Sequence, residues 1–353
     1  MTDAPNRPRT RAQKDVPLQP DYVVPNRGGD ARVGGGAATA RVTVENFRRA
    51  ESDRYMKAIV DAGGFATFYH HRLPMPIDKQ EIVRSNRDTL YSAAVFDLDA
   101  GAVTISLPNA MRRFMSLQVI DQDHYSHATI YGAGSHTFAK DLIGTRYMLA
   151  AVRTLANPFD EKDLAEAHAL QTNIGVLQHA TGAYEVPSWD PAGLARVRGA
   201  LTVLGETITD SKRTFGMRGQ VDPVRHLIAT ATAWGGNPEK DATYLTVTPA
   251  RNDGETVYRL NVDLVPVDGF WSISVYNSQG YFEPNERNAY SINNLTAKRN
   301  DDNTVDVQFG GCDADSPNCL PINPGWNYTV RLYRPRAEIL SGQWKFPQAR
   351  PAP

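Results

Sequence analysis

The chain has 353 residues, of which 41% are hydrophobic and 22% are charged, and its formal net charge at pH 7 is −1. This length exceeds what one compact core usually holds, so we expect two domains of a soluble globular protein. A net charge so close to zero gives no general attraction to nucleic acid or to an anionic membrane. No run of about eighteen apolar residues offers a membrane span.

The first part of the sequence is a predicted disordered tail. Residues 1–42 are rich in Pro, Arg, Asp and Gly and poor in the apolar side chains that a packed core needs. Residues 1–14 are polar and basic and lack the apolar centre of a signal peptide. As written, the chain is therefore expected in the cytoplasm, whereas a wrongly assigned start codon would allow a periplasmic or secreted protein.

A helix is predicted over residues 44–62, where apolar side chains recur on one face before Gly63-Gly64, with Thr43 as candidate cap.

A polar run follows at Asn86-Arg87-Asp88, just before a predicted strand that starts near Tyr91. Asn and Asp suit a turn closed by an Arg–Asp pair. An arginine among amides and hydroxyls at the mouth of a strand can equally hold a carboxylate or phosphate. Both interpretations stay open.

The stretch from Asp121 to His136 concentrates ionisable groups. Asp121, Asp123, His124 and His127 lie within seven residues, a composition that suits general acid–base chemistry or a divalent metal. On one strand, His124 and His127 would face opposite ways, so they converge only if the chain turns between them. The remaining possibility is a set of ordinary polar loop residues. We predict acid–base roles here and no metal.

Residues 160–235 carry helical periodicity. Apolar residues recur at helical spacing over 162–179 and 192–210, and Asp222-Pro223 opens a further helix with Asp as cap and Pro in the first turn. We interpret these apolar stripes as packing surfaces.

One strand recurs in the chain. Residues 269–277 alternate, so that Trp271, Ile273 and Val275 form a core face while hydroxyls and aromatics form the other face. Residues 113–121 align with them without a gap, and Phe114 and Ser116 match Phe270 and Ser272. In each copy a β-rich segment ending at a proline precedes the strand. We interpret this as an internal duplication; the alternative is that any two amphipathic strands look alike.

The two cysteines, Cys312 and Cys319, close a short loop at the tip of a predicted hairpin. This spacing favours a disulfide, which needs an oxidising compartment. Two free thiols are the second possibility, and a metal site is disfavoured because structural zinc takes four ligands.

These elements define the expected organisation of an α+β, mainly β protein. It comprises two β-sandwich or jelly-roll-like domains joined by helices. The expected boundaries are a tail at 1–42, an N-terminal β domain at 43–158, a helical connector at 159–236 and a C-terminal β domain at 237–348.

Several motifs resemble a known pair of bacterial domains. Residues 86–92, Asn-Arg-Asp-Thr-Leu-Tyr-Ser, resemble the signature of the domain of unknown function numbered twelve fifty-four. Residues 270–291, 326–333 and 342–345 look like its usual partner, numbered twelve fourteen. The resemblance implies two β-sandwich or jelly-roll-like domains joined by helices, often in exported proteins. It implies no established activity, although members are sometimes labelled carboxylesterase.

The functional hypothesis is a small-molecule enzyme, a hydrolase that acts on a polar or anionic substrate in a cleft between the β domains. Its expected catalytic residues are Asp88, Asp121, His124 and His127. Its expected substrate-binding residues are Asn86, Arg87, Tyr91, Trp271, Tyr276, Asn285, Tyr290 and Ser291.

The alternative is a non-catalytic protein that binds a carbohydrate or another small ligand on aromatic side chains. A structural assembly module is a third, weaker hypothesis. No cofactor, nucleic acid or membrane partner is expected, and a homo-oligomer is left open.

Overall fold

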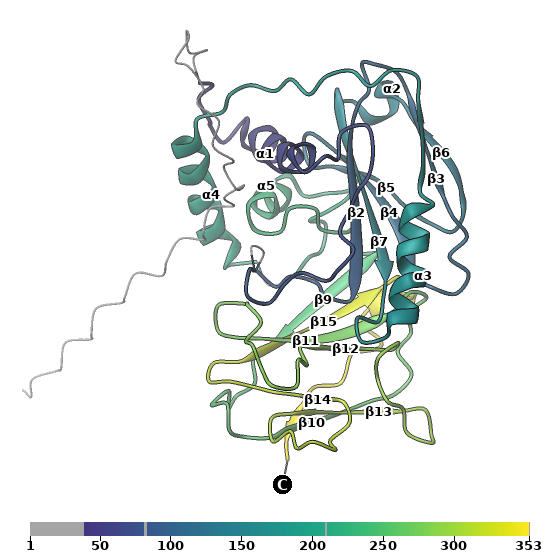
Figure 1. The fold of residues 1–353 in the computed structure, drawn as a ribbon. Coiled ribbons are helices and arrows are strands. Elements are labelled where there is room, and N and C mark those ends of the chain that lie inside the picture. Colours follow the sequence, from purple (N-terminus) through teal and green to yellow (C-terminus); the bar gives the residue numbers. More distant parts are fainter. Residues whose placement is uncertain (1–38, 81–82, 209, 353) are drawn as a thin grey trace, which may run out of the picture.

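The computed structural model describes residues 39–352, apart from residues 81, 82 and 209. Its described part is mainly β, with two sandwiches stacked along one axis and helices around the N-terminal one (Figure 1). This confirms the expected α+β class with two β-sandwich domains. The helices of the described part are α1 (Phe47–Asp61), α2 (Lys140–Ile143), α3 (Glu161–Thr172), α4 (Pro191–Gly205), α5 (Pro223–Thr232) and α6 (Ala337–Leu340).

The N-terminal sandwich packs a five-stranded sheet, in the order β1-β2-β7-β4-β5, against a three-stranded sheet, β6-β3-β8. Its core is the set of inward apolar side chains between the two sheets, which includes Phe96, Ile105 and Leu117. The strands are β1 (Tyr69–His70), β2 (Thr89–Asp97), β3 (Val103–Leu107), β4 (Met115–Asp121), β5 (Ser126–Tyr131), β6 (Gly134–Phe138), β7 (Tyr147–Leu155) and β8 (Gly175–Gln178).

The C-terminal sandwich packs the sheet β12-β11-β15-β9 against the sheet β14-β13-β10-β16. Trp271, Ile273 and Val275 point into its core, as the alternation predicts. The strands are β9 (Ala242–Val247), β10 (Tyr258–Val262), β11 (Trp271–Tyr276), β12 (Ser291–Asn293), β13 (Val305–Phe309), β14 (Cys319–Leu320), β15 (Asn327–Tyr333) and β16 (Arg350–Pro351).

The two sandwiches share one strand plan. In chain order, β2, β3, β4, β5, β6 and β7 correspond to β9, β10, β11, β12, β13 and β15, and each corresponding pair of neighbours is hydrogen-bonded in the same way. All of these shared pairings are antiparallel. Ser116 lies opposite Arg153 on β7, just as Ser272 lies opposite Arg331 on β15. The repeat seen in the sequence therefore extends to topology and register.

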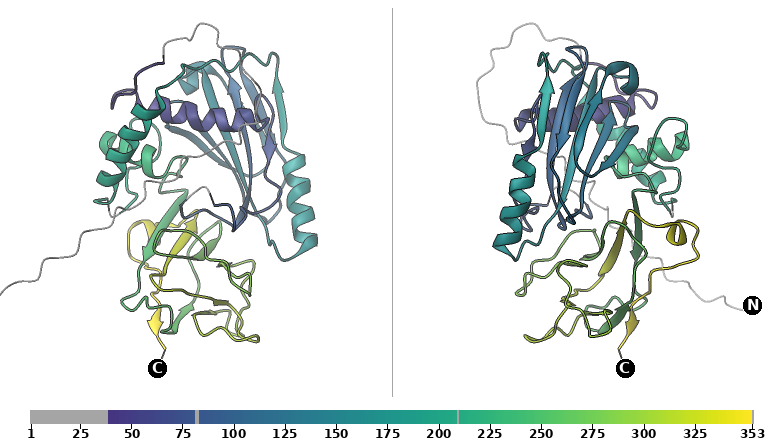
Figure 2. Two further views of the ribbon diagram at one scale, coloured as in Figure 1. Left: turned by 60° about the vertical axis from the view of Figure 1, so that its left-hand side comes forward. Right: turned by 90° about the vertical axis from the view of Figure 1, so that its right-hand side faces the viewer.

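The helices differ in part from the expectation. Helix α3 ends at Thr172, and residues 175–178 form β8, so the predicted helix over 162–179 is wrong in its second half. Tertiary pairing with β3 outweighs the helical apolar spacing there. Helices α4 and α5 pack with α1 on one side of the five-stranded sheet, while α3 lies on the other side (Figure 2). Residues 159–236 therefore contribute to the N-terminal unit.

The helix starts follow their sequence signals. Asp160, Asp190 and Asp222 each accept two backbone N–H groups at the starts of α3, α4 and α5. Helix α1 begins at Phe47 with Asn46 as its cap residue, and the cap makes no side-chain hydrogen bond; the expected cap, Thr43, lies before it.

The predicted tail falls largely outside the described residues. Its last residues belong to the folded protein, because Ala40 forms a bridge with Trp189 and Val42 is buried among the helices. Among residues 39–352, outside the short gaps, no helix combines the length and apolarity that crossing a bilayer requires.

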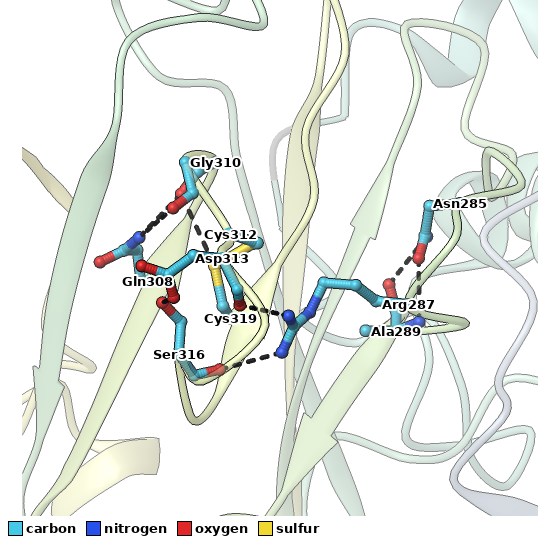
Figure 3. Close-up of a disulfide and its surroundings, with 10 residues drawn as sticks. Asn285, Arg287, Ala289, Gln308, Gly310, Cys312, Asp313, Ser316 and Cys319 are labelled. Carbon is cyan, nitrogen blue, oxygen red and sulfur yellow. Dashed lines mark hydrogen bonds between the residues drawn. A yellow bond between two sulfur atoms is a disulfide. The ribbon is translucent and has the colours of Figure 1, made fainter.

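A disulfide joins Cys312 to Cys319 at the end of the C-terminal sandwich (Figure 3). Arg287 donates to the backbone carbonyls of Asp313 and Ser316 inside this loop. The loop is therefore held both by a covalent bond and by the hydrogen bonds of one arginine to two of its carbonyl oxygens.

Replacing both Cys312 and Cys319 by Ser should lower the free energy of unfolding by about 2 kcal/mol, because a short closed loop no longer restricts the unfolded chain. Urea unfolding followed by tryptophan fluorescence measures this difference. A reductant should shift the midpoint of the wild type and leave that of the double variant unchanged. Equal midpoints for both proteins without reductant would contradict the prediction.

Candidate functional site

The segment before β2 crosses onto the C-terminal sandwich, where the sequence hypothesis placed a site. The Asn86 side chain donates to the Tyr333 hydroxyl at 2.9 Å, and Asp88 Oδ1 accepts from Asn293 Nδ2 at 3.0 Å. The Arg87 guanidinium lies 5.4 Å from the centre of the Tyr290 ring. The structure thus brings the Asn-Arg-Asp turn against residues of the C-terminal sandwich, as expected.

Arg331 is the central group of this contact, and only 3% of it is exposed. It donates to the backbone carbonyls of Arg84 and Ser85 in the crossing segment, and to the hydroxyls of Ser274 and Tyr276 on β11. Burial alone lowers the pKa of Arg331, but Tyr276, Tyr333 and Asp88 raise it on balance, so the group stays charged. A buried cation that binds carbonyls of another segment fixes that segment in place.

The N-terminal sandwich holds an equivalent arginine. Arg153 is 8% exposed and donates to Gln118 Oε1 on β4, to Asn237 Oδ1 and to the carbonyl of Gly235. Gln118 and Ser274 occupy equivalent positions, since Gln118 follows Ser116 by two residues on β4 and Ser274 follows Ser272 by two residues on β11. Residues 235–241 precede β9, so the segment leading into the C-terminal sandwich is bound by the N-terminal one.

A second pair of contacts also joins each sandwich to the segment that leads into the other one. Asp88, the last residue before β2, accepts from Asn293 on β12, and Asp241, the last residue before β9, accepts from the Tyr131 hydroxyl on β5 at 3.1 Å. Tyr131 lies opposite Ser116 and Asn293 lies opposite Ser272, so the two contacts are equivalent. The interface therefore has approximate two-fold symmetry.

Aromatic rings fill the centre of this interface. The Phe114 and Phe270 rings, which the sequence alignment matches, meet edge to face at 5.0 Å between centroids, and Phe270 stacks on Tyr333 at 4.3 Å. These rings are almost completely buried. The hydroxyl-and-aromatic face predicted for residues 269–277 is thus a layer between the domains.

Several of the expected binding residues line a small cavity on the C-terminal side of the contact. This cavity, lined by Tyr276, Asn285 and Tyr290 among other residues of the C-terminal sandwich, has about 10 Å³, which is about the space of one water molecule. The Asn285 amide is already used, because it both donates to the carbonyl and accepts from the N–H of Ala289.

The other expected binding residues are scattered. Trp271 is 4% exposed in the core of the C-terminal sandwich, so no ligand reaches its ring. Tyr91 is partly buried on β2, with the Arg153 guanidinium 5.5 Å from its ring centre. Ser291 lies on β12 opposite Ser274. Tyr91 and Ser291 therefore lie on strands beside the interface, while Trp271 points into the core of the C-terminal sandwich.

His124 is a structural histidine. Its Nε2 accepts from the N–H of Gly235 at 2.8 Å, so Nδ1 carries the proton and donates to Thr230 Oγ1 at 2.9 Å. The residue is 2% exposed and adopts a positive φ of 69° in the turn after β4. Burial, helped by His226 and Arg48, holds the pKa of His124 well below its usual range.

His127 and Asp121 form a hydrogen-bonded pair, with His127 Nε2 2.8 Å from Asp121 Oδ2. The other oxygen of Asp121 accepts from the N–H groups of Asp123 and Tyr125, which closes the turn. Asp121 lies opposite Met148, at the end of the sheet away from Leu155 and the Asp88 turn. Six to seven residues of strand separate the two ends by about 20 Å, so the expected acid–base group is not beside Arg87.

A larger cavity, the edge pocket, opens elsewhere, between the two sheets of the N-terminal sandwich. It has about 400 Å³, within the range of small-ligand sites. It lies where β1 and β8 form the free edges of their sheets. Its lining residues are Ala66, Thr67, Phe68, His70, Thr172, Ile174, Val176, Gln178 and Thr181.

His70 is the imidazole of the edge pocket. Its Nδ1 lies 2.8 Å from Ser92 Oγ, and Ser92 Oγ also accepts from Gln171 Nε2 at 3.2 Å. Burial, and then the charge of Arg72, lower the pKa of His70, so the ring is neutral at pH 7. Ser92 is completely buried, which prevents its hydroxyl from reaching a ligand as a nucleophile.

Sequence reasoning missed this pocket. Its walls come from alternate residues on two short segments, 66–70 and 174–178, and the second of these read as helix. Alternation of inward residues on both segments was the signal available, but it spans too few residues to distinguish strand from helix. In the described part of the chain, no group of three or more His, Cys, Asp or Glu residues has metal-binding geometry.

Two family models match the chain. Residues 65–141 match "Protein of unknown function (DUF1254)", and residues 243–337 match "Protein of unknown function (DUF1214)". The pair of domains expected from the motifs is therefore confirmed, in the expected order.

Two solved structures of bacterial proteins match the chain. The VPA0106 protein from Vibrio parahaemolyticus matches with a TM-score of 0.67 and 16% identity, over 88% of this chain and 98% of that one. An uncharacterized protein from Burkholderia cenocepacia matches with a TM-score of 0.49 and 14% identity, over 87% of this chain and 88% of that one. At such identity, the first match shows a shared fold alone. No curated protein matches the sequence.

Replacing Arg153 or Arg331 by Met should destabilise the whole protein by about 3–5 kcal/mol, because each change leaves buried carbonyl groups without a donor. Either variant should unfold both sandwiches in one transition at a lower urea concentration, measured by fluorescence and circular dichroism. Arg196→Met, on the exposed surface of α4, is the control and should change little. If either variant unfolded only one of the two sandwiches, the dependence of each sandwich on a segment of the other would be contradicted.

Stability should fall as the pH decreases below about 6.5. Burial lowers the pKa of both His124 and His226, so below that pH the unfolded chain binds protons that the folded protein does not. Each histidine should contribute a slope of up to about 1.4 kcal/mol per pH unit.

The variant His124→Asn tests this pH dependence, since Asn tolerates a positive φ and does not titrate. Its free energy of unfolding should decline less steeply than that of the wild type between about pH 6.5 and 5. His179→Asn, at an exposed position, is the control. Equal slopes for wild type and His124→Asn would show that His124 is not a buried neutral group.

Proposed function

We propose that this protein, which pairs a DUF1254 domain with a DUF1214 domain, binds a small uncharged ligand in the edge pocket without transforming it. The observation that carries the proposal is the pocket itself, with a volume of about 400 Å³ and an accessible lining that is mainly polar. A cavity of this volume is within the range of small-ligand sites.

The absence of charge in the lining supports an uncharged ligand. None of the lining residues carries a formal charge at neutral pH, since His70 is neutral there. A charged ligand would lose hydration in this pocket without gaining a counter-charge. The nearby cation, Arg72, already donates to the carbonyl of His168 and to Thr172 Oγ1.

The hydrolase expected from the sequence stays a prediction. It requires the Asn-Arg-Asp turn, a proton carrier and a bound substrate within one space. In the present structure His124 and His127 lie at the other end of the sheet from the Asn-Arg-Asp turn, and Asn86 and Asp88 are already hydrogen-bonded to Tyr333 and Asn293. The geometry supports the binding hypothesis better.

A matched pair of variants on β8 tests the proposal. Val176 lines the edge pocket, while its neighbour Leu177 is 65% exposed on the other face of the strand. Val176→Trp should fill the pocket and Leu177→Trp should leave it open. A thermal-shift screen with neutral, anionic and cationic small molecules should find neutral ligands that stabilise the wild type and Leu177→Trp but not Val176→Trp.

Incubating the same proteins with ester, lactone and glycoside substrates tests the alternative. Turnover that Arg87→Ala abolishes and Val176→Trp preserves would overturn the binding proposal in favour of an interdomain hydrolase. Ligands that stabilise Val176→Trp as well as the wild type would also overturn it.

A further inference from the structure

The edge pocket lies beside two strands that each have one free edge. Among the described residues, β8 pairs with β3 alone and β1 pairs with β2 alone, so each is the last strand of its sheet. Val176 and Gln178 of β8 and His70 of β1 line the pocket. The free edge of a strand presents backbone N–H and C=O groups that have no partner within the sheet, so another extended chain can bind them.

The free edge of β8 is open to such pairing. Residues 175–178 include no Lys or Pro, and their register with β3 has no bulge, so three devices that commonly protect an edge strand are missing here. The side chains of β8 alternate, with Val176 lining the pocket and Leu177 65% exposed on the other face. A chain that pairs with this edge would therefore direct every second side chain toward the pocket.

The C-terminal sandwich has a strand that corresponds to β8. β16 is antiparallel to β10, as β8 is to β3, and each follows the helix that comes after the last shared strand, α6 or α3. Residues 341–349, which join α6 to β16, place Phe346 in the core of their sandwich and Trp344 against it. Only residues 173 and 174 join α3 to β8. The N-terminal sandwich thus lacks a segment of this kind beside β8, which favours a chain segment as the occupant of the edge pocket.

The pocket selects among the side chains that such a segment could insert. Its accessible surface is mainly polar, and none of its lining residues carries a formal charge at neutral pH. Thr67 and Thr181, both exposed, offer hydroxyl groups that donate or accept. An uncharged polar side chain finds partners there, whereas a charged one would lose hydration without gaining a counter-charge.

We infer that the ligand of the edge pocket is a short extended peptide, an inference that rests on the proposed binding function. The peptide pairs its main chain with the free edge of β8 and places one uncharged polar side chain in the pocket. Because β8 has 4 residues, the paired part of the peptide is about equally short. Main-chain hydrogen bonds supply affinity in this mode of recognition, and the pocket supplies specificity.

Five-residue peptides with an acetylated N-terminus and an amidated C-terminus test the main-chain pairing on the full-length protein. The host peptide alternates Ser and Ala and has Ser at its centre, and ligand-observed NMR gives the affinities. Methylation of one amide nitrogen at a time removes one donor without adding charge. It should weaken binding about tenfold at every second position and change it little at the positions between, because alternate residues of an added strand turn their N–H groups toward β8.

Replacing the central Ser by Asn, Lys or Glu tests the selection of the side chain. The Ser or the Asn peptide should bind about tenfold more tightly than the Lys and Glu peptides, because the pocket offers no counter-charge. Val176→Trp should abolish binding of the Ser peptide, while Leu177→Trp should preserve it. Urea unfolding checks that both variants are folded, and the methylated peptides test the inference on the wild type if Val176→Trp does not fold.

The outcomes distinguish this inference from the proposed function. Equal losses at all methylated positions, no loss at any position, or tight binding of the Lys or Glu peptide would overturn the inference. If no peptide binds while another neutral ligand loses its binding in Val176→Trp, the peptide class is wrong and the pocket function stands. If no ligand distinguishes Val176→Trp from Leu177→Trp, both are wrong. Self-association of the wild type in sedimentation velocity that Val176→Trp removes would assign the edge to a second copy of the chain and would also overturn the inference.

Discussion

Two buried arginines hold this protein together. Arg153 and Arg331 occupy equivalent positions in the two sandwiches, and each binds backbone carbonyls of the segment that leads into the other sandwich. A guanidinium group removed from water is unfavourable unless its N–H groups are satisfied. Neither sandwich satisfies its own arginine completely, so each requires the segment that the other provides. The two halves are therefore expected to fold and unfold as one unit.

This exchange places part of the predicted cleft lining in contacts between the domains. Tyr276 donates to the Ser85 carbonyl across the interface, and Phe114 meets Phe270 there. Such contacts favour one relative arrangement of the two sheets, although Arg87 Nη1, Asp88 Oδ2 and Ser272 Oγ are buried without a partner among the described residues. The space for a ligand lies in the N-terminal sandwich, where two sheet edges stay apart.

The edge pocket and the interface meet different physical requirements. At the interface, charge is buried and compensated by carbonyl oxygens. In the edge pocket, the lining residues carry no formal charge and the surface open to a ligand is mainly polar. A concave, partly open site of this kind suits a ligand, whereas the contacts of Arg331 and Arg153 hold two segments of the chain in place.

The sequence by itself determined the local features of this protein. Alternation placed Trp271, Ile273 and Val275 in a core, Asp222 marked the start of α5, and the match of residues 113–121 with 269–277 reflects one strand plan used twice. It also marked Asn86-Arg87-Asp88 as a polar turn before a strand, but its contacts with Tyr333 and Asn293 come from residues about 200 positions away and belong to the tertiary structure. Only the tertiary structure decided that β8 is a strand, that His124 is neutral and buried, and that His70 and Gln178 share a pocket. The state of His124 depends on partners more than fifty residues away, Thr230 and Gly235. The strand β8 is a short segment whose pairing with β3 outweighs its intrinsic preference for a helix.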